Sequence, residues 1–349
     1  MKGHDGTRAS AMTIVFHERY LEHRQGGFMH PESPERLEAT IDRMKKEGFW
    51  QDILTPGPAK MEDLLRVHTP EYLDMLKNFG EGPLDPDTYM RPETWDIALL
   101  SAGGGVLAGD TAYEKDRPVM ALLRPPGHHA TPCRAMGFCY LNNIAISAAK
   151  LAKERNGRVA IIDIDLHHGN GTMEMFEDRE DVLYISTHQF PHYPGSGRIG
   201  EIGEGPGKGF SVNIPLPSGS GDATFDYAYD VLIEPVVRQY KPIIILVSIG
   251  GDSHYSDPLG GLTLSSEGYI RLANRMQKMA KDLCKGRIAY FLEGGYNVEA
   301  LAEVLTGIVA SFDGKKTNYT FTEVSDKDCV GGKSVDQVAK TLKGTWDLK

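Results

Sequence analysis

The middle of the chain contains the run Val159-Ala160-Ile161-Ile162-Asp163-Ile164-Asp165-Leu166-His167-His168-Gly169-Asn170-Gly171. Its apolar beginning is typical of a buried strand, and two carboxylates, two imidazoles and an amide follow. Buried charged groups are costly unless they have partners, so this run predicts bound ligands at the end of the strand. Aspartate and histidine together suit zinc or a similar divalent ion. The plainer interpretation is a polar loop in which Asp163 and Asp165 cap a helix.

The bulk composition is that of a globular enzyme. The 349 residues are long for one domain but fit a single large α/β unit. The formal net charge of -10 argues against nucleic acid as a direct partner, because phosphate binding requires a basic face. No window approaches the ~18 apolar residues of a membrane span. The four cysteines show no CxxC spacing and follow no signal peptide, so we expect reduced thiols in a cytoplasmic protein.

Apolar runs and helical patterns alternate over most of the chain. This alternation predicts a single α/β domain, with a mostly parallel sheet covered by helices on both faces. Residues 1–12 read as a loosely held leader and residues 13–314 as the catalytic domain. Apolar periodicity weakens after about Gly314, so residues 315–349 read as a loosely packed C-terminal appendage of the same domain. The expected strands are residues 13–16, 119–123, 159–162, 182–186, 210–214, 243–247 and 288–292, and the expected helices are residues 33–46, 92–114, 141–154, 222–240, 265–283 and 297–311.

Four of the expected strands end in reactive groups. In an open parallel sheet, ligands bind outside the carboxyl ends of the strands, so these groups should share one edge. The groups are the His128-His129 pair, the run from Asp163 to Gly171, Asp252, and the run from Glu293 to Tyr296.

These groups make a chemically sensible metal site. Asp165, His167 and Asp252 supply three ligands and leave a position open for water and substrate, as in catalytic zinc sites. His128 and His129 then lie beside the metal as general acid and base groups.

Three further side chains complete this arrangement. Asp163 and Asn170 can accept hydrogen bonds from the rings of the histidine pair and so fix their tautomers. Tyr296 can donate its hydroxyl to a developing oxyanion. Taken singly, each candidate has an ordinary explanation: a histidine pair in a surface turn, an aspartate as a cap, or Phe138 and Tyr193 in core packing. Only their joint placement favours a functional site.

The motifs resemble those of the histone deacetylase and acetylpolyamine amidohydrolase family, which has the arginase–deacetylase fold. The resemblance extends from about Phe16 to Ser311. The motifs that carry it are Arg124-Pro-Pro-Gly-His-His129, Gly137-Phe-Cys-Tyr-Leu-Asn142, Asp163-Ile-Asp-Leu-His-His-Gly-Asn-Gly171, Gly251-Asp252 with Asp257-Pro-Leu-Gly260, and Glu293-Gly-Gly-Tyr296.

The resemblance implies a role for each residue. Asp165, His167 and Asp252 would bind zinc, although iron(II) can use the same ligands. His129 would act as general base and then general acid, with His128 mainly electrostatic, and Tyr296 would polarise the amide carbonyl with the metal. A structural potassium ion would bind to Asp163, Asp165, His167, Ser186 and Thr187, partly through backbone oxygens, and a second monovalent ion near Phe176, Arg179, Val182 and Phe210. The tunnel for the acyl-lysine chain would be lined by Gly137, Phe138, Tyr193 and Leu259, and the acetate exit by Arg36.

Three positions refine the resemblance. Asn170 stands where one branch of the family has Asp, so the partner of the second histidine resembles that of class II enzymes. Leu259 stands where polyamine-selective eukaryotic members have a gatekeeping Glu. The loop from Gln189 to Gly195 resembles the class II and prokaryotic pattern.

We therefore expect a zinc-dependent amidohydrolase that removes acetyl groups from lysine side chains in proteins. The alternative within the family is hydrolysis of acetylpolyamines or other small acetylated amines. Two other classes stay open: an arginase-like enzyme with two manganese ions, and a catalytically silent reader of acyl-lysine. The sequence leaves the oligomeric state undetermined.

Overall fold

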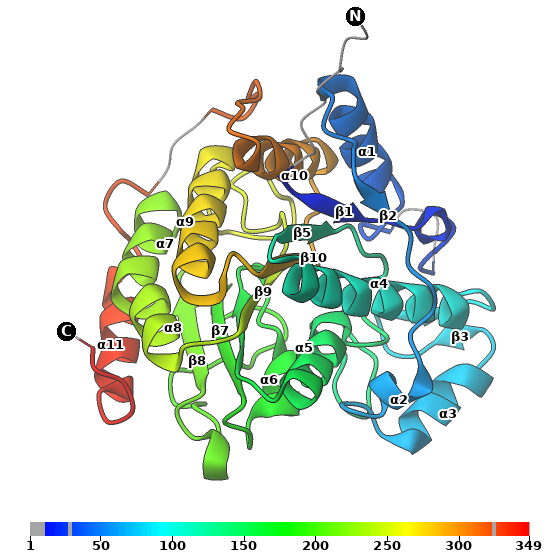
Figure 1. Ribbon diagram of the computed structural model, residues 1–349, viewed down its shortest axis with the longest axis horizontal. Helices are drawn as coiled ribbons and strands as arrows, with labels where there is room; N and C mark the ends of the chain where they lie inside the picture. Colours follow the sequence, from blue (N-terminus) through cyan, green and yellow to red (C-terminus); the bar gives the residue numbers. More distant parts are fainter. Residues whose placement is uncertain (1–10, 27–29, 323–325, 349) are drawn as a thin grey trace, which may run out of the picture.

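A parallel sheet runs through the centre of the molecule (Figure 1). The computed structural model describes residues 11–26, 30–322 and 326–348. Within these residues the sheet has eight strands, and every neighbouring pair is parallel. In spatial order they are β2 (Ile53–Leu54), β1 (Thr13–Val15), β5 (Pro118–Ala121), β10 (Ile288–Leu292), β9 (Ile244–Ile249), β6 (Val159–Asp163), β7 (Val182–Gln189) and β8 (Ser211–Leu216). The predicted α/β class and parallel sheet are confirmed.

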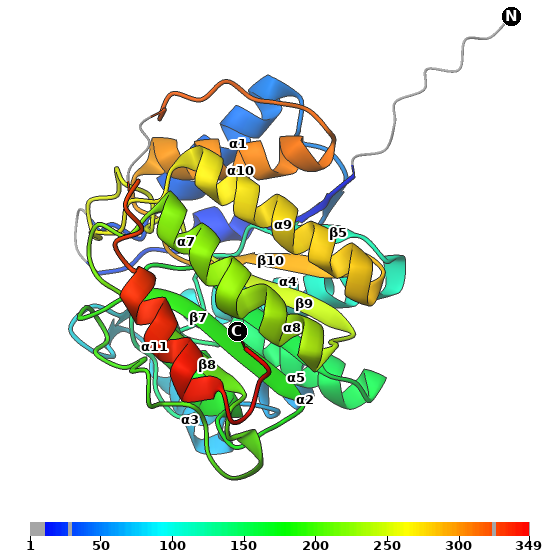
Figure 2. The same ribbon diagram turned by 90° about the vertical axis from the view of Figure 1, so that its left-hand side faces the viewer.

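Helices cover both faces of the sheet (Figures 1 and 2). Three of them start after a residue whose side chain accepts a hydrogen bond from the first turn: Asn142, Ser265 and Asn297. One face carries α4 (Thr94–Lys115), α5 (Asn143–Arg155) and α6 (Asn170–Phe176). The other carries α1 (Glu35–Glu47), α7 (Asp222–Ala228), α8 (Glu234–Tyr240), α9 (Ser266–Cys284) and α10 (Val298–Phe312), with a π-helical turn, Tyr229–Ile233, joining α7 to α8. None of the described helices is both long and apolar enough to cross a membrane.

The glycine run inside α4 is explained by close packing. A Cβ on Gly103 would lie 1.9 Å from the Gly57 carbonyl oxygen, and one on Gly105 would lie 2.8 Å from the Asn143 carbonyl oxygen. Glycine destabilises a helix interior by about 1 kcal/mol relative to alanine. A larger residue would push α4 away from the loop at Gly57 if it replaced Gly103, and away from the start of α5 if it replaced Gly105.

Several elements were not expected from the sequence. They are the short helices α2 (Met61–Leu64), α3 (Pro70–Asn78) and α6, the edge strand β2, the hairpin of β3 (Gly82–Pro83) and β4 (Tyr89–Met90), the 3-10 turns Glu18–Leu21 and Gly205–Gly207, and α11 (Gly332–Leu342). The last of these corrects an expectation, because the C-terminal segment is not loosely packed. Helix α11 lies against β8, and Val335 and Leu342 are buried in the main core. Trp346 donates a hydrogen bond from Nε1 to the Gly209 carbonyl oxygen at 2.8 Å. The expected leader lies almost wholly outside the described residues.

Candidate active site and metal centre

The carboxyl ends of four strands meet at one place in the sheet. Strands β5, β10, β9 and β6 are consecutive, so the loops that follow them are neighbours. These are the strands whose ends were predicted to carry the reactive groups, and their convergence at one edge is confirmed. The position agrees with the general rule for ligand sites in open parallel sheets.

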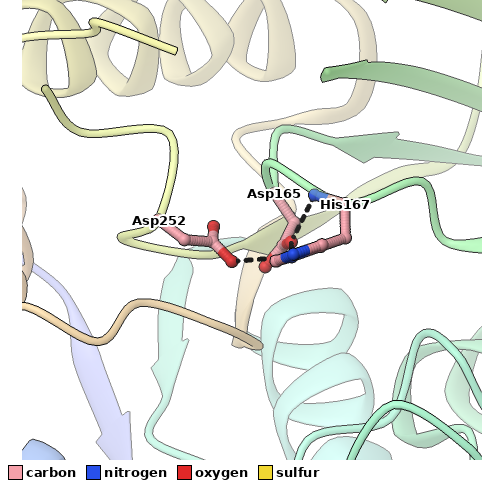
Figure 3. A group of neighbouring side chains, drawn as sticks. All are labelled: Asp165, His167 and Asp252. Carbon is pink, nitrogen blue, oxygen red and sulfur yellow. Dashed lines mark hydrogen bonds and ion pairs between the residues drawn. The ribbon is translucent and has the colours of Figure 1, made fainter. Parts of the chain in front are cut away.

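Three side chains form a compact group of metal-ligand type (Figure 3). Ligand atoms of Asp165, His167 and Asp252 all lie within 4.8 Å of one another. The His167 Nδ1 atom is 3.0 Å from Asp252 Oδ2 and 3.3 Å from Asp165 Oδ1. A Cβ on Gly250 would lie 2.0 Å from Asp165 Oδ2, and one on Gly294 would lie 2.2 Å from Asp252 Oδ2. The two glycines therefore leave room for this carboxylate pair.

The electrostatics of this group favour a bound cation. Burial, together with the negative charge of Asp165, raises the pKa of Asp252 to about 6. Burial opposes ionisation of Asp165 too, but the charges of His128 and His167 lower its pKa overall. Two buried carboxylates so close together repel each other unless a positive charge lies between them. Two carboxylates and one imidazole form a donor set that fits zinc.

The adjacent histidine pair has two different partners. His128 Nδ1 lies 3.1 Å from Asp163 Oδ2, and His129 Nδ1 lies 2.8 Å from Asn170 Oδ1. Both hydrogen bonds expected from the sequence are present. Because each partner offers an oxygen to Nδ1, the Nε2 atom of His129 is left to accept a proton when the ring is neutral.

The two imidazoles also differ in protonation. Burial lowers the pKa of both rings. For His128 the charges of Asp165, Asp163 and Glu293 outweigh burial and raise the pKa to about 10. For His129 the positive charges of His128 and His167 lower the pKa further. At neutral pH, His128 is therefore charged and His129 neutral.

Aromatic rings surround the histidine pair. The ring centroids of Tyr193 and His129 are 5.2 Å apart, and those of Phe138 and Tyr296 are 6.0 Å apart, both edge to face. Burial keeps the pKa of Tyr296 well above its usual value, so its hydroxyl remains a donor. Tyr193 and Leu259 are 37% and 38% exposed, so they lie where the site meets solvent.

The backbone of the Gly137-Phe138 turn has strict requirements. Both residues have positive φ, +57° and +67°. A Cβ on Gly137 would lie 2.4 Å from the His129 ring, so only glycine fits there. The side chains of Asp87 and Thr88 accept the amide hydrogens of Gly137 and Phe138 at 3.2 and 3.0 Å. These two residues could not be anticipated from the sequence, because they lie about 50 positions from the turn that they hold.

Arg36 lies beneath the turn that carries the tyrosine. It is fully buried, and it donates from Nε to the Gly295 carbonyl oxygen and from Nη2 to the Glu293 carbonyl oxygen, each at 2.6 Å. Its Cζ atom lies 5.3 Å from the centroid of the Tyr296 ring. Asp257 supports the same turn by accepting the amide hydrogen of Tyr296 at 2.6 Å.

The residues expected to hold monovalent ions lie in two places. Ser186 is the partner of Asp163 in the β6–β7 register, and Thr187 Oγ1 donates to the Asp163 carbonyl oxygen at 3.4 Å. Asp163 is linked to the metal-ligand group, because its Oδ1 accepts the amide hydrogen of Asp165 at 3.1 Å. The second set lies at the other end of β7, where the Arg179 amide donates to the Phe176 carbonyl oxygen at 3.1 Å and Val182 begins the strand. Phe210 accepts an amide hydrogen from Tyr184 of the same strand.

Comparisons with known proteins agree with this geometry. Residues 30–312 match the model of the histone deacetylase domain. A probable deacetylase of Archaeoglobus fulgidus is 45% identical over 309 residues, 86% of each chain. A histone deacetylase-like amidohydrolase of Pseudomonas aeruginosa is 40% identical over 281 residues, 77% of this chain and 73% of the other. The solved HDA15 HD domain superposes with a TM-score of 0.86 at 32% identity, covering 96% of this chain and 97% of that one. The protein therefore belongs to the histone deacetylase family of deacetylases and amidohydrolases.

Proposed function

We propose that the protein is a zinc-dependent deacylase that hydrolyses the acetyl amide of acetyl-lysine in proteins and releases acetate and the free amine. The observation that carries this proposal is the three-ligand group of Asp165, His167 and Asp252 next to the His128–His129 pair, whose Nδ1 atoms face Asp163 and Asn170.

The ligand group would hold one divalent ion. When bound, zinc lowers the pKa of a water molecule and polarises the amide carbonyl. Iron(II) accepts the same imidazole and carboxylate donors and can replace zinc in the cell. The nearby oxygens of Asp163, Ser186 and Thr187 would hold a structural potassium ion behind this group.

The protein's own residues carry the proton transfers. Neutral His129 accepts a proton from the attacking water and later delivers it to the leaving amine. Charged His128 remains protonated and stabilises negative charge as it develops. The hydroxyl of Tyr296 donates a hydrogen bond to the oxyanion. Arg36, which donates to the carbonyl oxygens of Gly295 and Glu293 in this turn, would line the path by which acetate leaves.

The substrate proposal rests on the walls of the site. Phe138 and Tyr193 offer ring faces and edges suited to the alkyl chain of lysine, and Leu259 adds an apolar side chain at the solvent boundary. A carboxylate at the position of Leu259 would instead favour a second ammonium group, as in a polyamine. The negative charge of the chain keeps small acetylated amines as the second candidate.

The test is hydrolysis of a fluorogenic acetyl-lysine peptide by the zinc-loaded protein, with and without a hydroxamate chelator. We expect turnover that the chelator abolishes, and one zinc per chain. N-acetylputrescine, assayed in parallel, should be turned over more slowly than the peptide. A strong preference for N-acetylputrescine would overturn the substrate assignment, whereas two metal ions per chain or no hydrolysis of either amide would overturn the proposed activity.

A further inference from the structure

Glu293 is a buried acid beside the catalytic histidines, and the proposed reaction gives it no part. It directly follows β10 and is 1% exposed. Its backbone amide donates to the Ile249 carbonyl oxygen at 2.9 Å, which ties it to the end of β9. The side chain therefore starts from a rigid point between two central strands.

Both oxygens of the Glu293 carboxylate are used. Oε2 accepts the amide hydrogens of Gly127 and His128, at 2.7 and 3.1 Å. Oε1 accepts the hydroxyl hydrogen of Ser248, on β9, at 3.0 Å. The carboxylate thus connects two sheet strands to the turn that leads into the histidine pair.

That turn has little freedom to adapt. A Cβ on Gly127 would lie 2.5 Å from the amide nitrogen of Asn143, so the turn is pressed against the start of α5. Proton transfer depends on ring positions, and a displacement of about 1 Å can lower turnover by about 100-fold. A group that fixes the backbone of His128 therefore fixes the geometry of both imidazoles.

We propose that Glu293 is a positioning residue, which holds the His128–His129 pair in its reactive geometry through the Gly127 and His128 amides. This inference rests on the proposed function, because it assigns Glu293 to the same site. Glu293 itself touches neither the reacting atoms nor the three metal-ligand side chains.

The hydrogen-bond pattern holds in either protonation state of the acid. Burial raises the pKa of Glu293 to about 7, so both forms are present near neutrality. When protonated on Oε1, the acid donates to the Ser248 hydroxyl while Oε2 still accepts both amides. Glutamine reproduces this protonated form, with its oxygen towards the amides and its nitrogen towards Ser248. The Gln variant therefore separates positioning from charge.

The chain offers a matched control in Glu303. This residue is also fully buried, and its carboxylate accepts a hydroxyl hydrogen from Ser266 and the amide hydrogens of Thr320 and Phe321, at 2.7, 2.6 and 3.2 Å. It lies on α10, away from the histidine pair. Glu303→Ala thus removes the same kinds of bond, and in addition an ion pair with Arg43 at 3.4 Å, without touching the proposed site.

The experiment measures kcat, KM and amide hydrogen exchange of residues 126–131 in zinc-loaded protein. We expect Glu293→Ala to lower kcat about 10- to 100-fold with little change in KM and to speed exchange in this segment. Glu293→Gln should stay within about threefold of the parent, and Glu303→Ala should retain the parental kcat and exchange there. If Glu293→Ala does not fold, Glu293→Asp, which is one methylene shorter, should show the same loss.

Three results would overturn the inference. They are unchanged exchange and kcat in the Ala or Asp variant, an equal loss in the Gln variant, and an equal loss in Glu303→Ala. If the parent hydrolyses no amide, the proposed function fails. The exchange data then still decide whether Glu293 holds the turn.

Discussion

Replacing Gly250 with alanine should weaken zinc binding by at least about 100-fold without unfolding the protein. The new Cβ would lie 2.0 Å from Asp165 Oδ2 and 2.5 Å from Asp252 Oδ1. Ordinary contact begins near 3.4 Å, so the Asp165 carboxylate must move by about 1.4 Å, whereas metal–ligand distances tolerate about 0.2 Å. The added methyl group therefore removes at least one of the three ligands.

The size of the expected loss in zinc affinity depends on how many ligands are lost. Disturbing only the outer hydrogen-bond partners of a metal site weakens binding by about 10- to 100-fold. Loss of a direct ligand should cost at least the upper end of this range, which corresponds to about 2.7 kcal/mol of binding free energy.

Zinc affinity is measured by competition with a chelating indicator, and the melting temperature reports on the fold. Gly200→Ala is the matched control, because a Cβ there meets nothing within 4 Å. It should bind zinc like the parent. Parental zinc affinity in Gly250→Ala would refute the assignment of Asp165 and Asp252 as ligands.

Two further predictions concern Tyr296 and a buried histidine. Tyr296→Phe keeps the ring against Phe138 and should lower kcat by about 100- to 1,000-fold at unchanged zinc content and melting temperature; equal turnover would exclude an oxyanion role. Burial lowers the pKa of His68 from 6.5 to about 4. As pH falls, His68 therefore takes up a proton in the unfolded chain at a higher pH than in the folded protein, and the free energy of unfolding decreases between pH 6.5 and 4. The protonation of His68 lowers the free energy of unfolding by about 3 kcal/mol over that pH range. In urea titrations at several pH values, the free energy of unfolding of His68→Gln should therefore fall less steeply with decreasing pH than that of the parent. Equal slopes for the two proteins would exclude this role of His68.

The site was largely predictable because its residues follow strands directly. A strand that ends in carboxylates and imidazoles can be recognised from the local sequence alone. Parallel strands bring all such ends to the same edge of the sheet, whatever the order of the strands. The ligand group and the bonds from His128 to Asp163 and from His129 to Asn170 could therefore be anticipated. The spatial order that puts β10 between β5 and β9 was not predicted, since it depends on pairing between distant segments.

The misread regions are those whose partners are remote. Val335, Val338 and Leu342 have helical spacing, but polar residues surround them, and the surface of β8 that they cover is remote in the sequence. Asp87 and Thr88 act only through the backbone of a turn about 50 residues away, and nothing in their local sequence indicates this contact. Such contacts are set by tertiary packing and leave no periodic pattern.

The different partners of the two histidines explain why Asn170 suits this site. His128 faces the carboxylate of Asp163, and this charge helps to keep it protonated. His129 faces an amide, which fixes the ring through an equally direct hydrogen bond but adds no negative charge. An opposite charge beside a histidine raises its pKa, so a second aspartate would move His129 towards the protonated form, which cannot accept a proton from water. Asparagine therefore provides orientation without protonation, and the pair divides into one electrostatic group and one base although both rings are buried side by side.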